Sequence, residues 1–287
     1  MRLILPALCL LSTYAWSDPA VWQVTDSQGG ELWLLGSIHY LRDQDYPLPT
    51  SIDRLYARAD ALVMEIDLDD LNPLAVQSAF LDAGALPASS SLRSVLAPAV
   101  YERLEAQAGA LGMELALMEQ FEPWLVALTF MDLGMNALGF RADQGIEQYL
   151  LRRARQDAKE IVGLETLDDQ IRIFDELTRD DQEALLIQTL EELGSPGSVM
   201  DELLDAWQEG RLDTLARELS AGFEGFPKLY RALVIQRNQV WAERLRHLLR
   251  EQRRLLVVVG ALHLVGPQSL LEFLANGGHI VTPMATP

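Results

Sequence analysis

Short apolar runs separated by turn residues open the chain. VWQVT and ELWLLGS are joined by a segment that ends in Gln28-Gly29-Gly30, an arrangement typical of a β-hairpin. A helix start follows at Pro49-Thr50-Ser51, and the next residues, IDRLYARAD, place apolar side chains at helical spacing. The run ALVMEIDL at 61–68 has the pattern of a buried strand. Strand, helix and strand at this spacing predict a right-handed parallel βαβ unit.

The middle of the chain has a helical pattern of apolar positions. This pattern covers about 72–160, and a strand-like segment, IVGLE, then ends at Glu165. Helices are predicted again from 167 to 252, broken at glycine-rich turns. The chain closes with a strand LLVVVG, a helix SLLEFLAN and a strand HIVTP. We therefore predict an α/β fold with a mainly parallel core sheet, built from N- and C-terminal βα units, with a helical insertion at about 72–252.

One octet occurs twice. LWLLGSIH at 32–39 returns as LVVVGALH at 256–263, each with an apolar run, a glycine, a small residue, an aliphatic residue and a histidine. Ligands of open parallel sheets bind at the carboxyl ends of the strands. The glycine of each octet allows a sharp exit from the strand or a close backbone approach. If the two strands are neighbours, the imidazoles of His39 and His263 face each other.

Carboxylates on other strands can complete this site. Glu65 interrupts an apolar strand, where an ionised side chain is costly unless it is paired. Together with His39 and His263, Glu65 can bind a divalent metal that acidifies water and polarises a carbonyl. The same side chains can instead perform general acid–base chemistry without a metal. The alternatives without function are two loop histidines and an acid that points outward from an edge strand.

Composition removes several classes of function. The chain has 42 acidic and 23 basic residues, a net charge of -19, so we expect no nucleic-acid partner. A hydrophobic fraction of 49% in 287 residues is enough for a full core. The chain contains no HExxH, Walker, GxGxxG or GxSxG motif, and its only cysteine is Cys9.

The N-terminal segment MRLILPALCLLSTYAWS is typical of a secretory signal peptide. A basic residue precedes a short apolar stretch, and Ala15 and Ser17 precede a cleavage position before Asp18. A buried first strand and a membrane anchor are the alternatives, but the apolar run is too short to cross a bilayer. We predict that residues 1–17 are removed, that residues 18–287 form one domain, and that the product is periplasmic or secreted.

A second apolar stretch, 121–140, is long enough to cross a membrane. Glu122 and Asp132 interrupt or flank it, so we predict a buried helix and no stable membrane span. The remaining histidines carry no predicted chemistry. His247 lies among basic residues on a helix and is expected to be solvated, and His279 is expected to be structural.

Six segments in order resemble the TraB/PrgY/GumN family, which includes the TIKI proteases. They are the paired Gly-x-x-His motifs, VMEIDL, FEPWL, GLETLDDQ and QRNQVWAERL, and they extend over nearly all the chain after residue 17. The resemblance implies an α/β core with a helical insertion, related to haem-binding ChaN proteins and erythromycin esterases. The TIKI branch is described as metal-dependent, so the resemblance implies manganese or cobalt, with zinc as a further candidate.

The resemblance also implies roles for individual residues. His39, Glu65 and His263 would bind the metal and, with Arg237, carry catalysis, because the charge of arginine can stabilise an oxyanion. A salt bridge on a helix surface is the alternative for Arg237. The predicted supporting residues, which hold loops or approach the site closely, are Gly36, Gly260, Glu165, Asn238 and Gln170.

These observations predict a secreted or periplasmic metal-dependent hydrolase, with a peptide or protein as substrate. A binding protein that sequesters a peptide signal or haem without turnover is one alternative. An ester hydrolase that works without a metal is another.

Overall fold

The core of the protein is a mixed six-stranded sheet. The computed structural model describes residues 20–67, 69, 71–194 and 197–284, so the predicted signal peptide and Cys9 lie outside the described residues. Within these residues the strand order is β4-β3-β5-β2-β1-β6, and β4, β3, β5 and β2 are mutually parallel. β1 is antiparallel to β2 and β6. The strands are β1 (Val21–Thr25), β2 (Glu31–Ser37), β3 (Ala61–Ile66), β4 (Glu160–Glu165), β5 (Leu255–Gly260) and β6 (Ile280–Pro283).

The two repeated octets form neighbouring strands, which is the condition for their histidines to share a site. β2 and β5 pair in parallel with Leu32 opposite Leu255 and Ser37 opposite Gly260. This register is shifted by one residue from the alignment of the two sequences. His263 therefore lies one position further from the sheet than His39, although the octets are otherwise equivalent.

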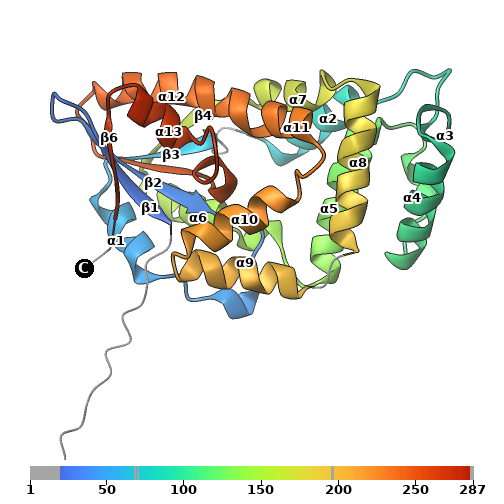
Figure 1. The fold of residues 1–287 in the computed structure, drawn as a ribbon, viewed down its shortest axis with the longest axis horizontal. Helices are drawn as coiled ribbons and strands as arrows, with labels where there is room; N and C mark the ends of the chain where they lie inside the picture. Colours follow the sequence, from blue (N-terminus) through green and yellow to red (C-terminus); the bar gives the residue numbers. More distant parts are fainter. Residues whose placement is uncertain (1–19, 68, 70, 195–196, 285–287) are drawn as a thin grey trace, which may run out of the picture.

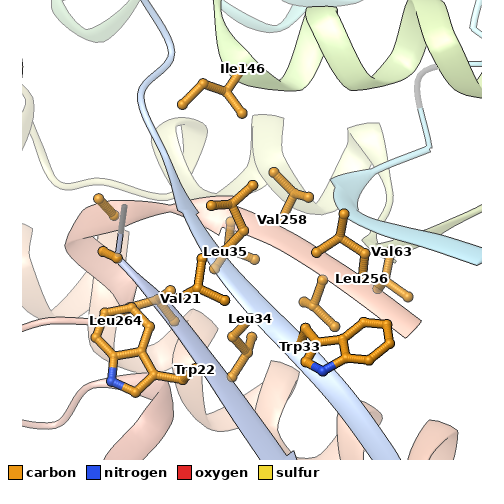
Figure 2. Packing of buried hydrophobic residues seen from close by; sticks show 14 of the residues in the cluster. Val21, Trp22, Trp33, Leu34, Leu35, Val63, Ile146, Leu256, Val258 and Leu264 are labelled. Carbon is orange, nitrogen blue, oxygen red and sulfur yellow. The ribbon is translucent and has the colours of Figure 1, made fainter. Parts of the chain in front are cut away.

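Helices cover both faces of the sheet. α1 (Thr50–Arg58) and α6 (Ile146–Asp157) lie on one side, and α12 (Gln236–Leu249) and α13 (Leu270–Asn276) lie on the other (Figure 1). In α12 the apolar residues Trp241, Leu245 and Leu249 recur every four positions and are buried, which fixes the face that this helix turns to the sheet. Side chains of β2 and β5 fill the centre of this core (Figure 2).

Part of the helical middle has a hydrophobic core of its own, whereas α9 (Ser198–Gln208) and α10 (Leu212–Ala221) pack into the core of the sheet. The separate core is built around Trp124, Phe130 and Leu186, where α5 packs against α8. The predicted buried helix in 121–140 is α5, and no helix in the described ranges is long and apolar enough to cross a membrane. The helices of this region are α2 (Pro73–Ala83), α3 (Leu92–Val95), α4 (Pro98–Ala110), α5 (Pro123–Ala137), α7 (Leu167–Asp175), α8 (Arg179–Leu193), α9 (Ser198–Gln208) and α10 (Leu212–Ala221).

The long helix predicted before the last βα unit contains a wide turn. It begins as α11 (Pro227–Tyr230), passes through a π-helical turn at Arg231–Ile235 and continues as α12. The wide turn directly precedes Arg237 and Asn238. π-Turns inside α-helices occur frequently at functional sites.

Candidate functional site

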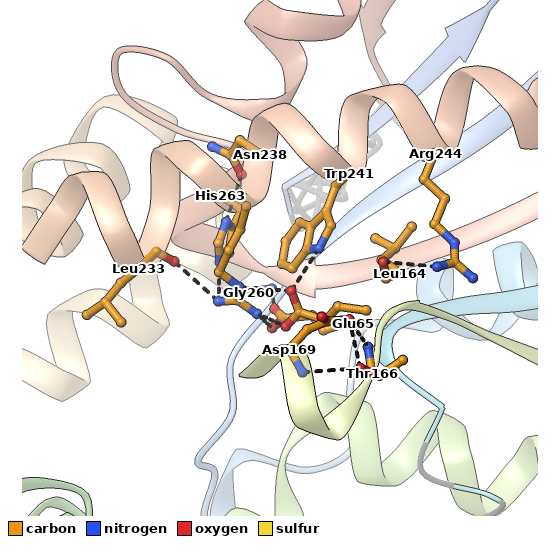
Figure 3. Close-up of polar contacts among 12 residues, drawn as sticks. Glu65, Leu164, Thr166, Asp169, Leu233, Asn238, Trp241, Arg244, Gly260 and His263 are labelled. Atoms are coloured by element: carbon orange, nitrogen blue, oxygen red, sulfur yellow. Dashed lines mark hydrogen bonds and ion pairs between the residues drawn. The ribbon is translucent and has the colours of Figure 1, made fainter. Parts of the chain in front are cut away.

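The predicted site residues gather at one edge of the sheet. Because β2, β3, β4 and β5 are parallel, their carboxyl ends meet at the same edge. Glu65 is the last residue but one of β3, Glu165 ends β4, and the two histidines follow β2 and β5. Helix α12 adds Arg237, Asn238 and Trp241. Figure 3 shows Asn238 and Trp241 on this helix beside Glu65 and His263.

Arg237 lies at the centre of this group. Its Nε and Nη2 bind the two oxygens of Glu165 at 3.2 and 2.7 Å, and Nη2 also donates to Glu65 Oε2 at 2.5 Å. Nη1 donates to the carbonyl of Leu233 at 3.3 Å and lies 3.2 Å from His263 Nε2. The Trp241 ring lies beneath the guanidinium, 4.5 Å away.

This arrangement bears on both roles considered for Arg237. Its side chain is 15% exposed, so it is a buried ion pair and not a salt bridge on a helix surface. A guanidinium has five N–H donors, and these contacts use all five. No donor is left for a substrate oxyanion unless an existing contact breaks.

The proton on His263 can be assigned from its neighbours. Asn238 Nδ2 donates to the carbonyl of Gln268 at 3.0 Å, so its Oδ1 faces His263 Nδ1, 2.7 Å away. An amide oxygen only accepts, so Nδ1 of His263 carries the proton and Nε2 accepts from Arg237. Burial lowers the pKa of His263 to about 3, and the neighbouring Arg237 charge lowers it as well, against the opposing effect of Glu65. His263 is therefore neutral, with both nitrogens engaged.

Glu65 is ionised and fully engaged too. Its Oε1 accepts the backbone N–H of Gly260 at 2.8 Å, and its Oε2 accepts from Arg237. Burial alone would raise the pKa of Glu65, but Arg237, the two histidines and this backbone N–H outweigh burial and lower it to about 2. The charge predicted at this strand is therefore present and paired.

His39 has a different environment. Its side chain is 56% exposed, and its Nδ1 lies 2.6 Å from Glu147 Oε1. Ser37 Oγ donates to the same carboxylate oxygen, which fixes the orientation of Glu147. The Glu147 charge raises the pKa of His39 to about 9, against the effect of desolvation. In the described part of the chain, Nε2 of His39 has no hydrogen-bond partner.

Glu147 was not predicted from the sequence. It lies in the first turn of α6, where an acid is common because it favours the helix dipole. The signal that could have revealed it is Gly145 at the start of this helix. A Cβ there would lie 2.2 Å from the carbonyl oxygen of His39, so only glycine lets α6 begin against the histidine.

The two predicted glycines allow close contacts. A Cβ on Gly260 would lie 3.0 Å from His39 Nε2 and 3.4 Å from Glu65 Oε1, so this glycine leaves room for both side chains. A Cβ on Gly36 would lie 3.2 Å from Ala261 Cα. The carbonyl of Gly36 also accepts the indole N–H of Trp207 at 2.6 Å, which ties the helical middle to β2.

A cavity of about 370 Å³ opens beside these residues. Its charged wall is formed by His39, Glu65, Glu147 and Arg237, and Gln148 and Gln170 add two amides. Gln170, predicted to hold a loop, thus lines the cavity itself. The remaining wall is apolar and contains Met64, Ile66, Ala142, Ile173, Phe174 and Leu233.

The remaining predicted residues have structural roles. Leu164 is buried in the core, Glu165 binds Arg237 and Trp241, and Thr166 caps α7 by accepting from the Asp169 backbone. His247 is exposed, as predicted. The Nδ1 of His279 lies 3.2 Å from the carbonyl of Leu274, which agrees with a structural role.

The predicted metal ligands do not fit a metal ion in this arrangement. His263 Nε2 and Glu65 Oε2 both point at the Arg237 guanidinium, a cation that lies where their shared ion would have to bind. Across residues 20–284, apart from the four undescribed positions between them, no group of three histidine, aspartate or glutamate side chains is arranged to hold a metal. His39 alone presents an open nitrogen.

Fold and site together define an α/β protein with histidines and carboxylates at the carboxyl edge of a mostly parallel sheet. The chain belongs to the TraB/PrgY/gumN family, whose model matches residues 20–283. It is 29% identical over 261 residues to YbaP of Escherichia coli (strain K12), an uncharacterized protein, covering 91% of this chain and 93% of that one. An uncharacterized Treponema pallidum protein is 25% identical over 275 residues, covering 88% and 79%. No solved structure matches the chain.

The Arg237 contacts predict a specific stability change. Arg237→Gln leaves Glu65 and Glu165 buried without their cation, so we expect a loss of about 3 kcal/mol or more in the free energy of unfolding at neutral pH, measured in urea. The exposed Arg172 provides a control, since Arg172→Gln should change stability by less than about 0.5 kcal/mol.

The pH dependence of this loss tests its cause. The pKa of Glu65 is lowered from 4.5 in the unfolded chain to about 2 in the fold, so its stabilising effect is present above pH 4.5 and disappears as the pH falls toward 2. The difference between wild type and Arg237→Gln should therefore shrink over that range. A difference that is constant with pH would contradict the ion pair as its source.

Proposed function

We propose that this protein is a hydrolase of neutral carbonyl compounds, esters or amides, in which His39 transfers the proton. The observation that carries this proposal is the His39–Glu147 pair at the cavity, where Nδ1 binds the carboxylate at 2.6 Å. Because Nδ1 faces an acceptor, it retains its proton, and the neutral ring carries its lone pair on Nε2. This is the arrangement of a histidine base oriented by an acid.

The reaction follows from this proton assignment. Neutral His39 takes a proton from water through Nε2 while the hydroxide adds to the carbonyl carbon. The imidazolium then returns the proton to the leaving oxygen or nitrogen as its bond to that carbon breaks. Glu147 stabilises the imidazolium between the two steps, which is consistent with the raised pKa of His39. Glu147 does not itself contact the reacting atoms, so it is a positioning residue.

The cavity favours a neutral substrate with a compact apolar group. All five N–H groups of Arg237 are used within the protein, so an anionic substrate finds no unpaired arginine donor. Phe174, Ile173 and Leu233 provide an apolar wall. Gln148 and Gln170 are the amide donors that can bind the carbonyl oxygen. A peptide bond and a short-chain ester both meet these requirements.

The metal-dependent peptidase predicted from the sequence requires a different arrangement. Arg237 would have to withdraw before His39, Glu65 and His263 could share manganese, cobalt or zinc, so the metal-dependent function stays a prediction. Sequestration of a peptide signal or haem, and the likeness to ChaN and erythromycin esterases, stay predictions as well.

We also propose export to the periplasm or medium. N-terminal sequencing of the mature protein would test this proposal, because the mature chain should begin at Asp18.

Substitution of His39 should abolish turnover. His39→Gln should lower kcat/KM for p-nitrophenyl butyrate, a neutral short-chain ester, by about 100-fold or more, because the proton acceptor is lost. His247→Gln replaces an exposed histidine and is the matched control, with activity expected at the wild-type level. The same pair should be compared on a quenched peptide library. Equal activity of both variants would remove His39 from the mechanism.

The pH profile tests the role of Glu147. In the wild type, kcat/KM should rise with pH toward about 9, as His39 loses its second proton. Glu147→Gln removes the charge that raises the His39 pKa, so the inflection should move down by one pH unit or more. Glu105→Gln, an exposed acid on α4, should leave the profile unchanged. An inflection that does not move in Glu147→Gln would exclude this pairing.

Chelation distinguishes the proposed metal-free mechanism from the metal-dependent one. Dialysis of the mature protein against EDTA should leave ester hydrolysis within about twofold of the untreated rate, since the proposed reaction needs only protein side chains and water. Loss of activity that manganese or cobalt restores would support the metal-dependent mechanism and overturn the proposed metal-free mechanism.

A further inference from the structure

A second cavity lies in the helical middle, apart from the sheet edge. Its volume is about 430 Å³, and residues of α5, α8, α9 and α10 and of the turn after α10 line it. These four helices lie together beside the sheet (Figure 1). None of the residues lining this cavity lines the first one, so the two are distinct sites.

Most of this second cavity is apolar and adaptable. Met131 and Met135 of α5 and Met200 of α9 line it, together with Leu203 and Leu219. Methionine side chains are unbranched and polarizable, so they adjust to apolar groups of different shape and contact aromatic rings favourably. The wall therefore fits a compact hydrocarbon or aromatic group.

Every ionisable residue that lines this cavity is acidic. Glu191, Glu192, Glu218 and Glu224 line it, and no lysine or arginine does. Glu218 already pairs with Arg217 at 2.9 Å. The Glu192 carboxylate accepts only the Gln188 amide, at 3.1 Å, among the partners that the described residues provide. Desolvation of this carboxyl raises the pKa of Glu192, although part of the side chain is exposed.

Gln188 adds an unpaired acceptor beside Glu192. It is 6% exposed, and its Nε2 is used by Glu192, while its Oε1 has no partner within the described ranges. A buried amide oxygen without a donor is unfavourable by about 1–3 kcal/mol. An unpaired acceptor and a carboxylate without a cation thus lie side by side in the wall of one cavity.

Gly222 keeps both groups in place. A Cβ on this residue would lie 2.4 Å from Glu192 Oε1 and 3.2 Å from Gln188 Nε2. A side chain at position 222 would therefore displace the Glu192 carboxylate from its place beside Gln188.

We propose that this second cavity binds an amphipathic organic cation, an amine that carries a compact apolar group. The ammonium binds at Glu192 and Gln188, and the apolar group packs between the methionines of α5 and α9. A cation is favoured because the lining has acceptors and negative charge but no basic side chain. This site is independent of the hydrolase proposed above.

Three probes with the same apolar body test the proposal. 4-Phenylbutylamine, 4-phenylbutanol and 5-phenylpentanoate each carry a phenyl ring on four methylenes and differ only in a cationic, neutral or anionic head group. In calorimetric titrations of the folded protein, the amine should bind saturably at one site, the alcohol should bind about 10-fold more weakly, and the carboxylate should not bind. Equal binding of all three, or no saturable binding of the amine, would overturn the proposal.

Variants and spectra place the site. Glu192→Gln should weaken amine binding about 10-fold and leave alcohol binding unchanged, whereas Glu105→Gln and His39→Gln should bind the amine like the wild type. In NMR spectra of methyl-labelled methionine, the amine should shift the signals of Met131, Met135 and Met200 but not that of Met64, which lines the first cavity. This measurement needs no variant. A shift of Met64 alone would assign the binding to the first cavity and refute the second site.

Discussion

One guanidinium determines the geometry of the sheet edge. Arg237 reaches down from α12 and joins carboxylates from β3 and β4 to the histidine that follows β5. Burying such charges is costly, and the cost is offset only when every donor and acceptor is paired. Here the pairing is complete: Trp241 donates to a Glu165 oxygen that Arg237 also binds, and the backbone N–H of Gly260 donates to the Glu65 oxygen that Arg237 does not bind. The strand ends are consequently held at fixed positions relative to one another.

Two histidines in equivalent sequence positions have opposite states because their neighbours differ. His263 is buried beneath α12, where Arg237 and the Asn238 amide favour the neutral ring. His39 lines the cavity beside the carboxylate of Glu147, to which Ser37 also donates, and is charged more readily. Because the β2–β5 register is shifted by one residue, the two histidines lie at different distances from the sheet. His263 is held by hydrogen bonds on both nitrogens, whereas His39 keeps one nitrogen that can transfer a proton.

Much of the fold could be predicted from local patterns. The hairpin, the helix at Thr50, the strand around Glu65 and the parallel pairing of the two octets follow from apolar spacing and turn residues. The family was also predicted correctly.

The site was predicted only in part, because its pairings join residues far apart in the chain. Glu147 resembles an ordinary first-turn acid, and nothing in the sequence indicates that Ser37 and His39 meet it. Arg237 was predicted as a site residue, but its contacts were not. All five of its N–H donors are engaged only because three strands and a helix come together in the fold. The spacing of residues in the sequence could indicate which side chains lie at the site, but not which hydrogen bonds they make there.

The position of β5 has a consequence for biosynthesis. This strand lies between β2 and β3, yet it is made after β1, β2, β3 and β4. Before it emerges, the nascent chain can form the β1–β2 hairpin and the β3–β4 pair, but nothing joins them, and each exposes an unpaired apolar edge. The sheet therefore cannot close until β5 has been synthesised, and the two strand edges that it will cover stay unpaired until then.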